Sequence, residues 1–83
     1  MLRLAAAYEL AGDNPAALAV YDKALTVDPH NAFNWLRLGV FYRRIGETAR
    51  AIEALQYSQR LNNSEPIAQR HIEEIAAKSA VKP

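Results

Sequence analysis

Three closely spaced arginines carry the clearest chemical signal in the sequence. Arg37, Arg43 and Arg44 lie in a segment, residues 32–50, whose only acidic residue is Glu47. A guanidinium can donate two parallel hydrogen bonds to one carboxylate, so the cluster suits an acidic peptide or a chain terminus as partner. The alternative is that each arginine is an ordinary surface residue paired with an acidic side chain of this chain: Glu9, Glu47 or Glu74.

No other combination of residues indicates a catalytic, cofactor or metal site. Cysteine is absent, and His30 and His71 lack the spacing of a metal pair on one helix face. Glu73 and Glu74 are adjacent, so on a helix they point in different directions and cannot work as an acid–base pair. The serines fit no nucleophile elbow and the three glycines form no phosphate loop. We therefore predict that the protein is not an enzyme and uses no cofactor or metal.

Charge and hydropathy narrow the class of partner and the compartment. A net charge of +1 argues against broad electrostatic capture of nucleic acid. No apolar run of about 18 residues is present, so no membrane span is expected. The N-terminal residues do not resemble a signal peptide, because Arg3 is soon followed by Glu9. The absence of cysteine slightly favours the cytoplasm but also suits a secreted chain, which leaves the localisation open.

Composition and turn residues predict an all-helical chain. Half of the residues are apolar, with many alanines and leucines and few β-branched residues. Gly12 and Gly46 are expected to end helices in a left-handed conformation, and Asn14, Thr48 and Asn31 are expected to be N-caps. These signals divide the chain into five expected antiparallel helices, at residues 2–11, 15–28, 32–45, 49–61 and 66–79.

The sequence repeats itself at a shift of 34 residues. The matched positions are Leu2-Arg3-Leu4 with Leu36-Arg37-Leu38, Tyr8 with Tyr42, Gly12 with Gly46, and Ala17 with Ala51. Helical spacing predicts packing stripes made of Trp35, Leu38, Gly39, Tyr42 and Ile45 in one helix and of Ala51, Ile52 and Leu55 in the next. Gly39 and Ala51 are small, as two closely approaching helices require.

These residues resemble the tetratricopeptide repeat family, whose unit has the pattern W-x2-L-G-x2-Y…A-x3-F…A…P. The residues that carry the resemblance are Tyr8, Ala17, Pro29, Trp35, Leu38, Gly39, Tyr42, Gly46 and Ala51. The resemblance covers essentially the whole chain. It implies one domain over residues 1–83, with a shortened first unit (1–31), a complete second unit (32–65) and a C-terminal capping helix (66–80). The implied fold is all-α, with antiparallel hairpins stacked as a short right-handed α-solenoid.

The resemblance also implies a protein–protein interaction module that binds a peptide or helix of a partner on its concave face. In the family, ligand-facing residues come from the first helix of each unit. By position, the expected contact residues are Phe33, Leu36, Arg37, Val40, Arg43, Arg44 and Arg70. For the apolar residues among these, the alternative to ligand contact is that the last helix covers them.

Two further functions remain open from the sequence. About two and a half repeats are present where roughly three are usually needed for stability. The chain is therefore alternatively a scaffold segment of a longer repeat protein, or a homodimer that hides the apolar face of its first helix. A more distant alternative is a helical-repeat RNA binder, against which the near-neutral charge and the acidic first hairpin weigh.

Overall fold

Five α-helices make up the chain in the computed structural model, which describes residues 2–62 and 66–80. The helices are α1 (Leu2–Leu10), α2 (Asn14–Val27), α3 (Ala32–Arg44), α4 (Thr48–Leu61) and α5 (Pro66–Ala80). Each expected helix is found with ends within one residue of the prediction, and the described residues include no strand. The predicted all-α fold is confirmed.

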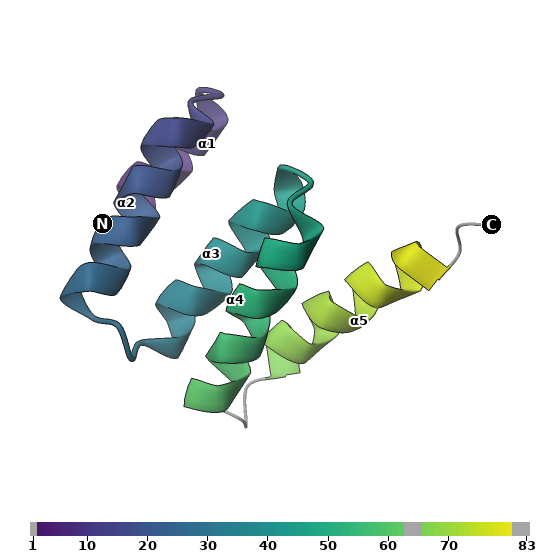
Figure 1. Cartoon of the computed structure of the whole chain (residues 1–83). Coiled ribbons are helices and arrows are strands. Elements are labelled where there is room, and N and C mark those ends of the chain that lie inside the picture. The colour runs from purple at the N-terminus through teal and green to yellow at the C-terminus, as the bar shows by residue number, and fades with distance from the viewer. Residues whose placement is uncertain (1, 63–65, 81–83) are drawn as a thin grey trace.

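The helices form two antiparallel hairpins followed by a single helix (Figure 1). The first hairpin is α1 with α2, and the second is α3 with α4. The second hairpin has the more extensive contact between its helices, whereas α2 touches α3 over a smaller area. α5 packs against α4 and also reaches α3. The central helix of the arrangement is therefore α3, which has neighbours on both sides.

The same turn ends the first helix of both hairpins. Gly12 and Gly46 have φ values of 80° and 86°, the left-handed region that glycine occupies at little cost. The next residue in each turn donates a backbone hydrogen bond five residues back, Asp13 to Tyr8 at 2.8 Å and Glu47 to Tyr42 at 2.9 Å. This is the 6→1 bond of a Schellman motif, so the predicted helix ends are confirmed.

Of the three predicted N-caps, only one is found. Asn31 caps α3 as predicted, because its side-chain oxygen accepts from the N–H groups of Phe33 (2.9 Å) and Asn34 (3.2 Å). Asn14 and Thr48 are not caps; each is the first residue of its helix.

The residue before each is the N-cap, because both helices begin one position earlier than expected. The Asp13 carboxylate accepts from the Ala16 N–H at 3.2 Å. Glu47 makes no side-chain capping bond; its carboxylate instead lies 3.8 Å from Nε of Arg50. The aligned acidic residues of the two repeats therefore occupy the same structural position.

Two buried clusters hold the helices together. The first joins the two hairpins and consists of Ala5, Ala17, Tyr21, Leu38, Phe41 and Ala54. The second joins the second hairpin to α5 and consists of Leu36, Ala51, Leu55, Ala68 and Ile75. α3 contributes to both clusters, so it buries residues outside its predicted stripe.

One residue of that predicted stripe is exposed. Ile45 is 39% exposed, because α3 ends at Arg44 and Ile45 follows as its C-cap. The predicted close approach of α3 and α4 is confirmed at Gly39. A methyl group on Gly39 would lie 2.7 Å from Cγ of Leu55 and 3.3 Å from the Ala51 carbonyl oxygen.

Candidate functional site

Two of the three arginines of the predicted cluster form ion pairs within the chain. Nη1 of Arg44 lies 2.9 Å from Oε1 of Glu9 on α1. Nη1 of Arg43 lies 2.7 Å from Oε1 of Glu74 on α5. These two side chains link α3 to the helices on either side of it. Pairing within the chain was the alternative that the sequence left open for these arginines, and it is the arrangement observed.

Glu9 is the centre of a polar junction between the hairpins. Its side chain is only 6% exposed, and besides Arg44 it accepts a 2.6 Å hydrogen bond from the Tyr21 hydroxyl. Burial, the hydrogen bond to Glu9 and the negative charge of Glu9 raise the pKa of Tyr21 to about 12, against the opposing effect of Arg37. Arg37 therefore belongs to this junction as well.

Alkaline pH should weaken the fold through Tyr21. An unfolded tyrosine ionises near pH 10, but the folded chain holds this proton to about pH 12. The stabilisation is complete below pH 10 and is lost as the pH rises through the folded pKa, a change of about 2–3 kcal/mol. Urea denaturation at a series of pH values measures it. Tyr21→Phe should remove this part of the pH dependence and the exposed Tyr57→Phe should keep it; parallel curves for Tyr21→Phe and the parent would contradict the junction.

His71 on α5 takes part in the second link of α3. Nη1 of Arg43 donates to Nδ1 of His71 at 2.6 Å, which requires a neutral imidazole with its proton on Nε2. Burial, Arg43 and Arg70 lower the pKa of His71, whereas Glu74 partly opposes them. The Arg43 hydrogen bond also lowers the pKa of the Glu74 carboxyl group. The hydrogen bond from Arg43 of α3 to His71 of α5 therefore requires an unprotonated His71.

Mild acid should loosen α5. The lowered pKa of His71 gives stability that is present above the unfolded value of 6.5 and is lost as the pH falls through the folded pKa. Amide hydrogen exchange in α5, corrected for its intrinsic pH dependence, should therefore rise relative to α2 as the pH is lowered from neutrality. His71→Gln should lose this dependence, while His30→Gln, in an exposed turn, should retain it. Equal protection of the α5 amides above and below the pH at which His71 becomes protonated would contradict the expectation.

The apolar part of the predicted contact surface is largely covered. Leu36 is 6% exposed in the cluster beneath α5, and Val40 packs against the same cluster. Leu36 therefore packs beneath α5, which is the alternative that the sequence left open for the apolar residues. Phe33 is 57% exposed, and Arg70 is exposed as well. Of the predicted contact residues, Phe33, Arg37 and Arg70 thus belong neither to the core nor to the two ion pairs.

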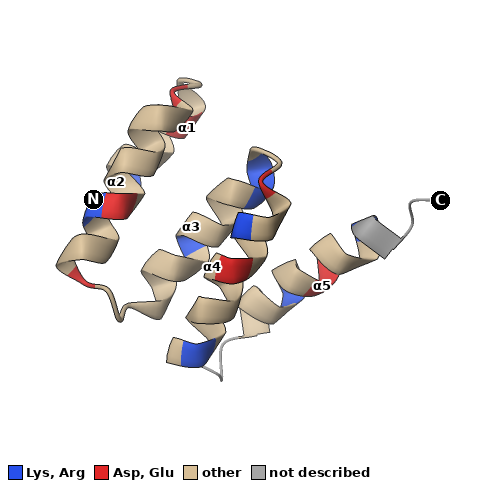
Figure 2. Cartoon of the chain, in the orientation of Figure 1, with Lys and Arg blue, Asp and Glu red and all other residues tan. Residues whose placement is uncertain are grey.

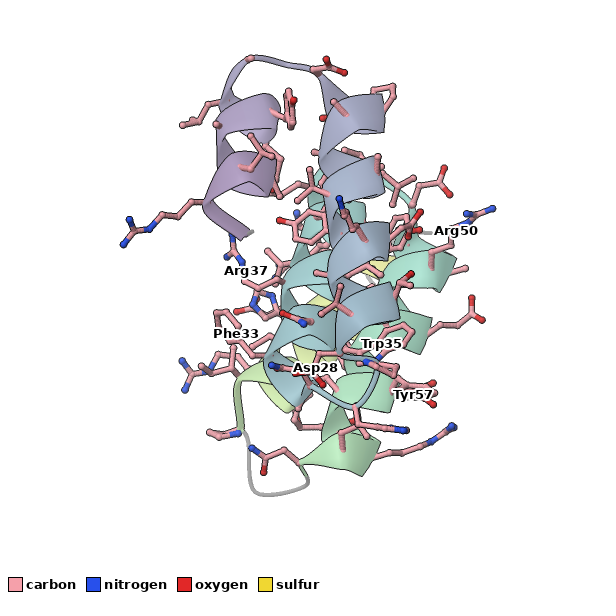
Figure 3. The ribbon with its side chains drawn as sticks, turned by 90° about the vertical axis from the view of Figure 1, so that its left-hand side faces the viewer. Asp28, Phe33, Trp35, Arg37, Arg50 and Tyr57 are labelled. Carbon is pink, nitrogen blue, oxygen red and sulfur yellow. The ribbon has the colours of Figure 1, made fainter. Side chains whose placement is uncertain are left out.

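A groove lies on another side of α3, and it was not predicted. In Figure 3, Phe33 and Arg37 project to one side of the molecule, and Trp35, Arg50 and Tyr57 project to the other. The groove has a volume of about 520 Å³ and lies between α2 and the second hairpin. We call it the inter-hairpin groove; its lining residues are Asp22, Leu25, Trp35, Leu38, Tyr42, Arg50, Glu53, Ala54 and Tyr57.

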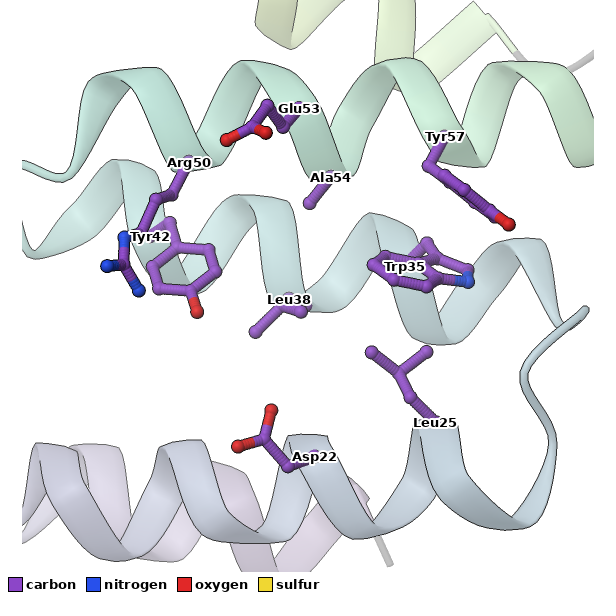
Figure 4. A pocket seen from close by; sticks show the side chains of 9 residues that line it. All are labelled: Asp22, Leu25, Trp35, Leu38, Tyr42, Arg50, Glu53, Ala54 and Tyr57. Carbon is purple, nitrogen blue, oxygen red and sulfur yellow. The ribbon is translucent and has the colours of Figure 1, made fainter.

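The floor of the inter-hairpin groove is an apolar stripe along α3. Trp35, Leu38 and Tyr42 follow one another at helical spacing, and Figure 4 shows them between the α2 and α4 walls. Trp35 stacks on Tyr57 of α4 with ring centroids 4.4 Å apart, and its Nε1 donates to the Pro29 carbonyl oxygen at 2.8 Å. Both indole contacts hold the ring in place. The groove therefore presents a fixed aromatic surface.

Charged residues occupy the two walls. Asp22 lies on the α2 wall, and Glu53 and Arg50 lie on the α4 wall (Figure 4). Among the described residues, each of the five helices carries at least one lysine or arginine (Figure 2).

Comparison with known families identifies the fold. One sequence model described as tetratricopeptide repeat matches residues 1–41, and a second with the same description matches residues 34–60. The chain belongs to the tetratricopeptide repeat family. A comparison with curated proteins gave no match. The two matches together extend through both hairpins of this tetratricopeptide repeat chain and end near the end of α4.

Several groove residues match the tetratricopeptide repeat pattern, and this match predicted helix packing instead of ligand binding. Trp35, Leu38 and Tyr42 were assigned to the packing stripe, and only Leu38 is buried. Arg50, Glu53 and Tyr57 recur every three or four residues on α4, which places them on one helix face beside the tryptophan helix. This spacing is the feature of the sequence that could have indicated the α4 wall of the groove. No sequence pattern indicates Asp22 and Leu25 as groove residues, because their place opposite α4 depends on how the hairpins pack.

The described part of this tetratricopeptide repeat chain shows neither a metal cluster nor a membrane span. Within residues 2–62 and 66–80, no three His, Cys, Asp or Glu side chains are grouped so as to hold a metal ion. Among the helices in the same ranges, none combines the length and the apolar character needed to cross a bilayer. The inter-hairpin groove and the exposed residues around Phe33 are therefore the features from which a function is argued.

Proposed function

We propose that this chain binds a segment of another polypeptide in the inter-hairpin groove. Tetratricopeptide repeats are generally protein–protein interaction modules. The observation that carries the proposal is the groove of about 520 Å³, whose floor and wall present Trp35, Tyr42 and Tyr57 only partly covered. Aromatic side chains are enriched where proteins bind one another, because they contribute a large rigid apolar area with a polar edge.

The composition of the groove suits a polypeptide better than a small apolar molecule. Apolar contact is available at Leu25, Leu38 and Ala54, while charged groups stand on both walls. A polypeptide can meet both requirements, since it offers apolar side chains for the floor and polar ones for the walls. A groove that lies along a helix can also hold several consecutive side chains of a guest.

Trp35 makes the proposal directly testable, because it is the only tryptophan of the chain and lies in the groove. Peptides selected from a random display library on the intact chain should change its fluorescence on titration. Tyr57→Ala removes an exposed stacking partner and should weaken binding by about tenfold or more. Phe33→Ala, which removes another exposed aromatic on the other side of α3, is the matched control and should leave affinity unchanged. Selected peptides that bind the Tyr57→Ala variant as tightly as the parent would overturn the proposal.

A second candidate surface surrounds Phe33. Its supporting observation is the 57% exposure of a phenylalanine on α3, the helix that also carries Arg37. The predicted peptide contacts Phe33, Arg37 and Arg70 would then receive the guest, with the arginines favouring an acidic one. The same titrations separate the two surfaces: peptides bound there lose affinity with Phe33→Ala and keep it with Tyr57→Ala.

A further inference from the structure

We propose that the occupant of the inter-hairpin groove is an amphipathic α-helix of the partner, with an apolar stripe and basic residues along its flanks. This inference rests on the proposed polypeptide binding and adds the conformation and charge of the guest. It follows from three features of the groove: the spacing of its floor, the position of its walls and the unpaired charges on them.

The floor has the form of one side of a helix–helix contact. Trp35, Leu38 and Tyr42 form a row along α3, and the walls come from α2 and α4 on either side of it (Figure 4). Such a row of side chains packs into the grooves of another helix. A helix satisfies its own backbone hydrogen bonds, whereas an extended guest needs backbone partners, which this side-chain-lined groove does not offer within the described residues.

The walls carry two carboxylates without a partner. Asp22 stands on the α2 wall and Glu53 on the α4 wall, and neither carboxylate has a hydrogen bond or ion pair within residues 2–62 and 66–80. Arg50, the basic residue of the α4 wall, already lies 3.8 Å from a Glu47 oxygen. The groove therefore has an apolar floor between two acidic edges. The complementary guest is apolar in the middle and basic on both sides.

Three other carboxylates of the chain are paired with arginines, unlike the two carboxylates on the groove walls. Glu9, Glu47 and Glu74 each face an arginine of their own chain. Asp22 and Glu53, which come from different hairpins, both line the same groove and remain unpaired in the described structure. Long basic side chains on a guest helix can lay their methylene groups over the apolar floor and reach the walls with their charged ends.

The test uses peptides selected from a random display library on the intact chain, with Trp35 fluorescence as the readout of groove binding. Far-UV circular dichroism should show helix forming in the peptide on binding. Proline at a solvent-facing guest position, one where alanine is tolerated, should weaken binding about a hundredfold, because it breaks a helix. A guest that binds in the groove and tolerates proline there overturns the inference and leaves the proposed function standing.

The charge of the guest is tested on the protein. The double variant Asp22→Asn, Glu53→Gln should weaken binding about three- to tenfold and reduce its salt dependence. Glu73→Gln, which removes an exposed carboxylate from α5, is the matched control and should change neither. Selected peptides without basic residues, or an unchanged affinity of the double variant, would contradict the acidic edges. Peptides that bind without any response to Tyr57→Ala would instead contradict the proposed function itself.

Discussion

Replacing Phe41 with alanine should lower the free energy of unfolding by about 3–5 kcal/mol. The ring is 1% exposed and belongs to the cluster that joins the two hairpins. Its centroid lies 5.4 Å from that of Tyr21, so truncation removes an aromatic contact as well as buried area. Small domains have little stability in reserve. Urea denaturation followed by circular dichroism should therefore find the variant largely unfolded before much urea is added.

Phe33→Ala is the matched control for this prediction. It changes the same residue type on the same helix, but Phe33 is 57% exposed. Its cost should stay below about 1 kcal/mol, because little buried area is lost. Similar losses for the two variants would contradict the placement of Phe41 between the hairpins.

Leu55→Ala should cost about 2–5 kcal/mol, because a fully buried side chain is removed from the contact between α3 and α4. The space that it leaves adjoins Gly39, which has no side chain to fill it. A methyl group on Gly39 would occupy this space, since it would lie 2.7 Å from the Cγ position of Leu55.

The effect of Gly39→Ala should therefore reverse between the two backgrounds. In the parent it should cost about 0–2 kcal/mol, because crowding against Leu55 exceeds the gain in helix propensity. In Leu55→Ala it should stabilise by about 1–2 kcal/mol, because it fills the cavity and also favours the helix. A double-mutant cycle from urea denaturation measures the difference. The same effect in both backgrounds would show that the two helices do not meet at Gly39.

The sequence predicted the helices and their close contact because local signals determine them. Gly12 and Gly46 require a left-handed conformation that only a turn provides, and Asn31 has a side chain that reaches the first free N–H groups of α3. Gly39 is small at a position where the repeat pattern expects a helix contact. Each of these features depends on a few neighbouring residues and on the repeat period.

The arrangement of the charged residues and the groove depends on contacts that the sequence does not display. Arg44 pairs with Glu9, which lies on a different hairpin, and Arg43 pairs with Glu74 on the last helix. The sequence left open whether these arginines face a ligand or pair with glutamates of the chain, because spacing on one helix gives no information on what stands opposite. The groove escaped prediction for the same reason: Asp22 faces the second hairpin only as a result of tertiary packing.

The most direct test of groove binding is an NMR titration of the isotope-labelled chain with a peptide selected on it. If a polypeptide binds in the inter-hairpin groove, the largest amide and side-chain shift changes should occur at Trp35, Tyr42, Glu53 and Tyr57, with the indole N–H of Trp35 among them. Intermolecular NOEs should connect guest side chains to the same residues. Changes centred on Phe33, Arg37 and Arg70, with an undisturbed Trp35 indole, would contradict the account and place the binding site on the other side of α3.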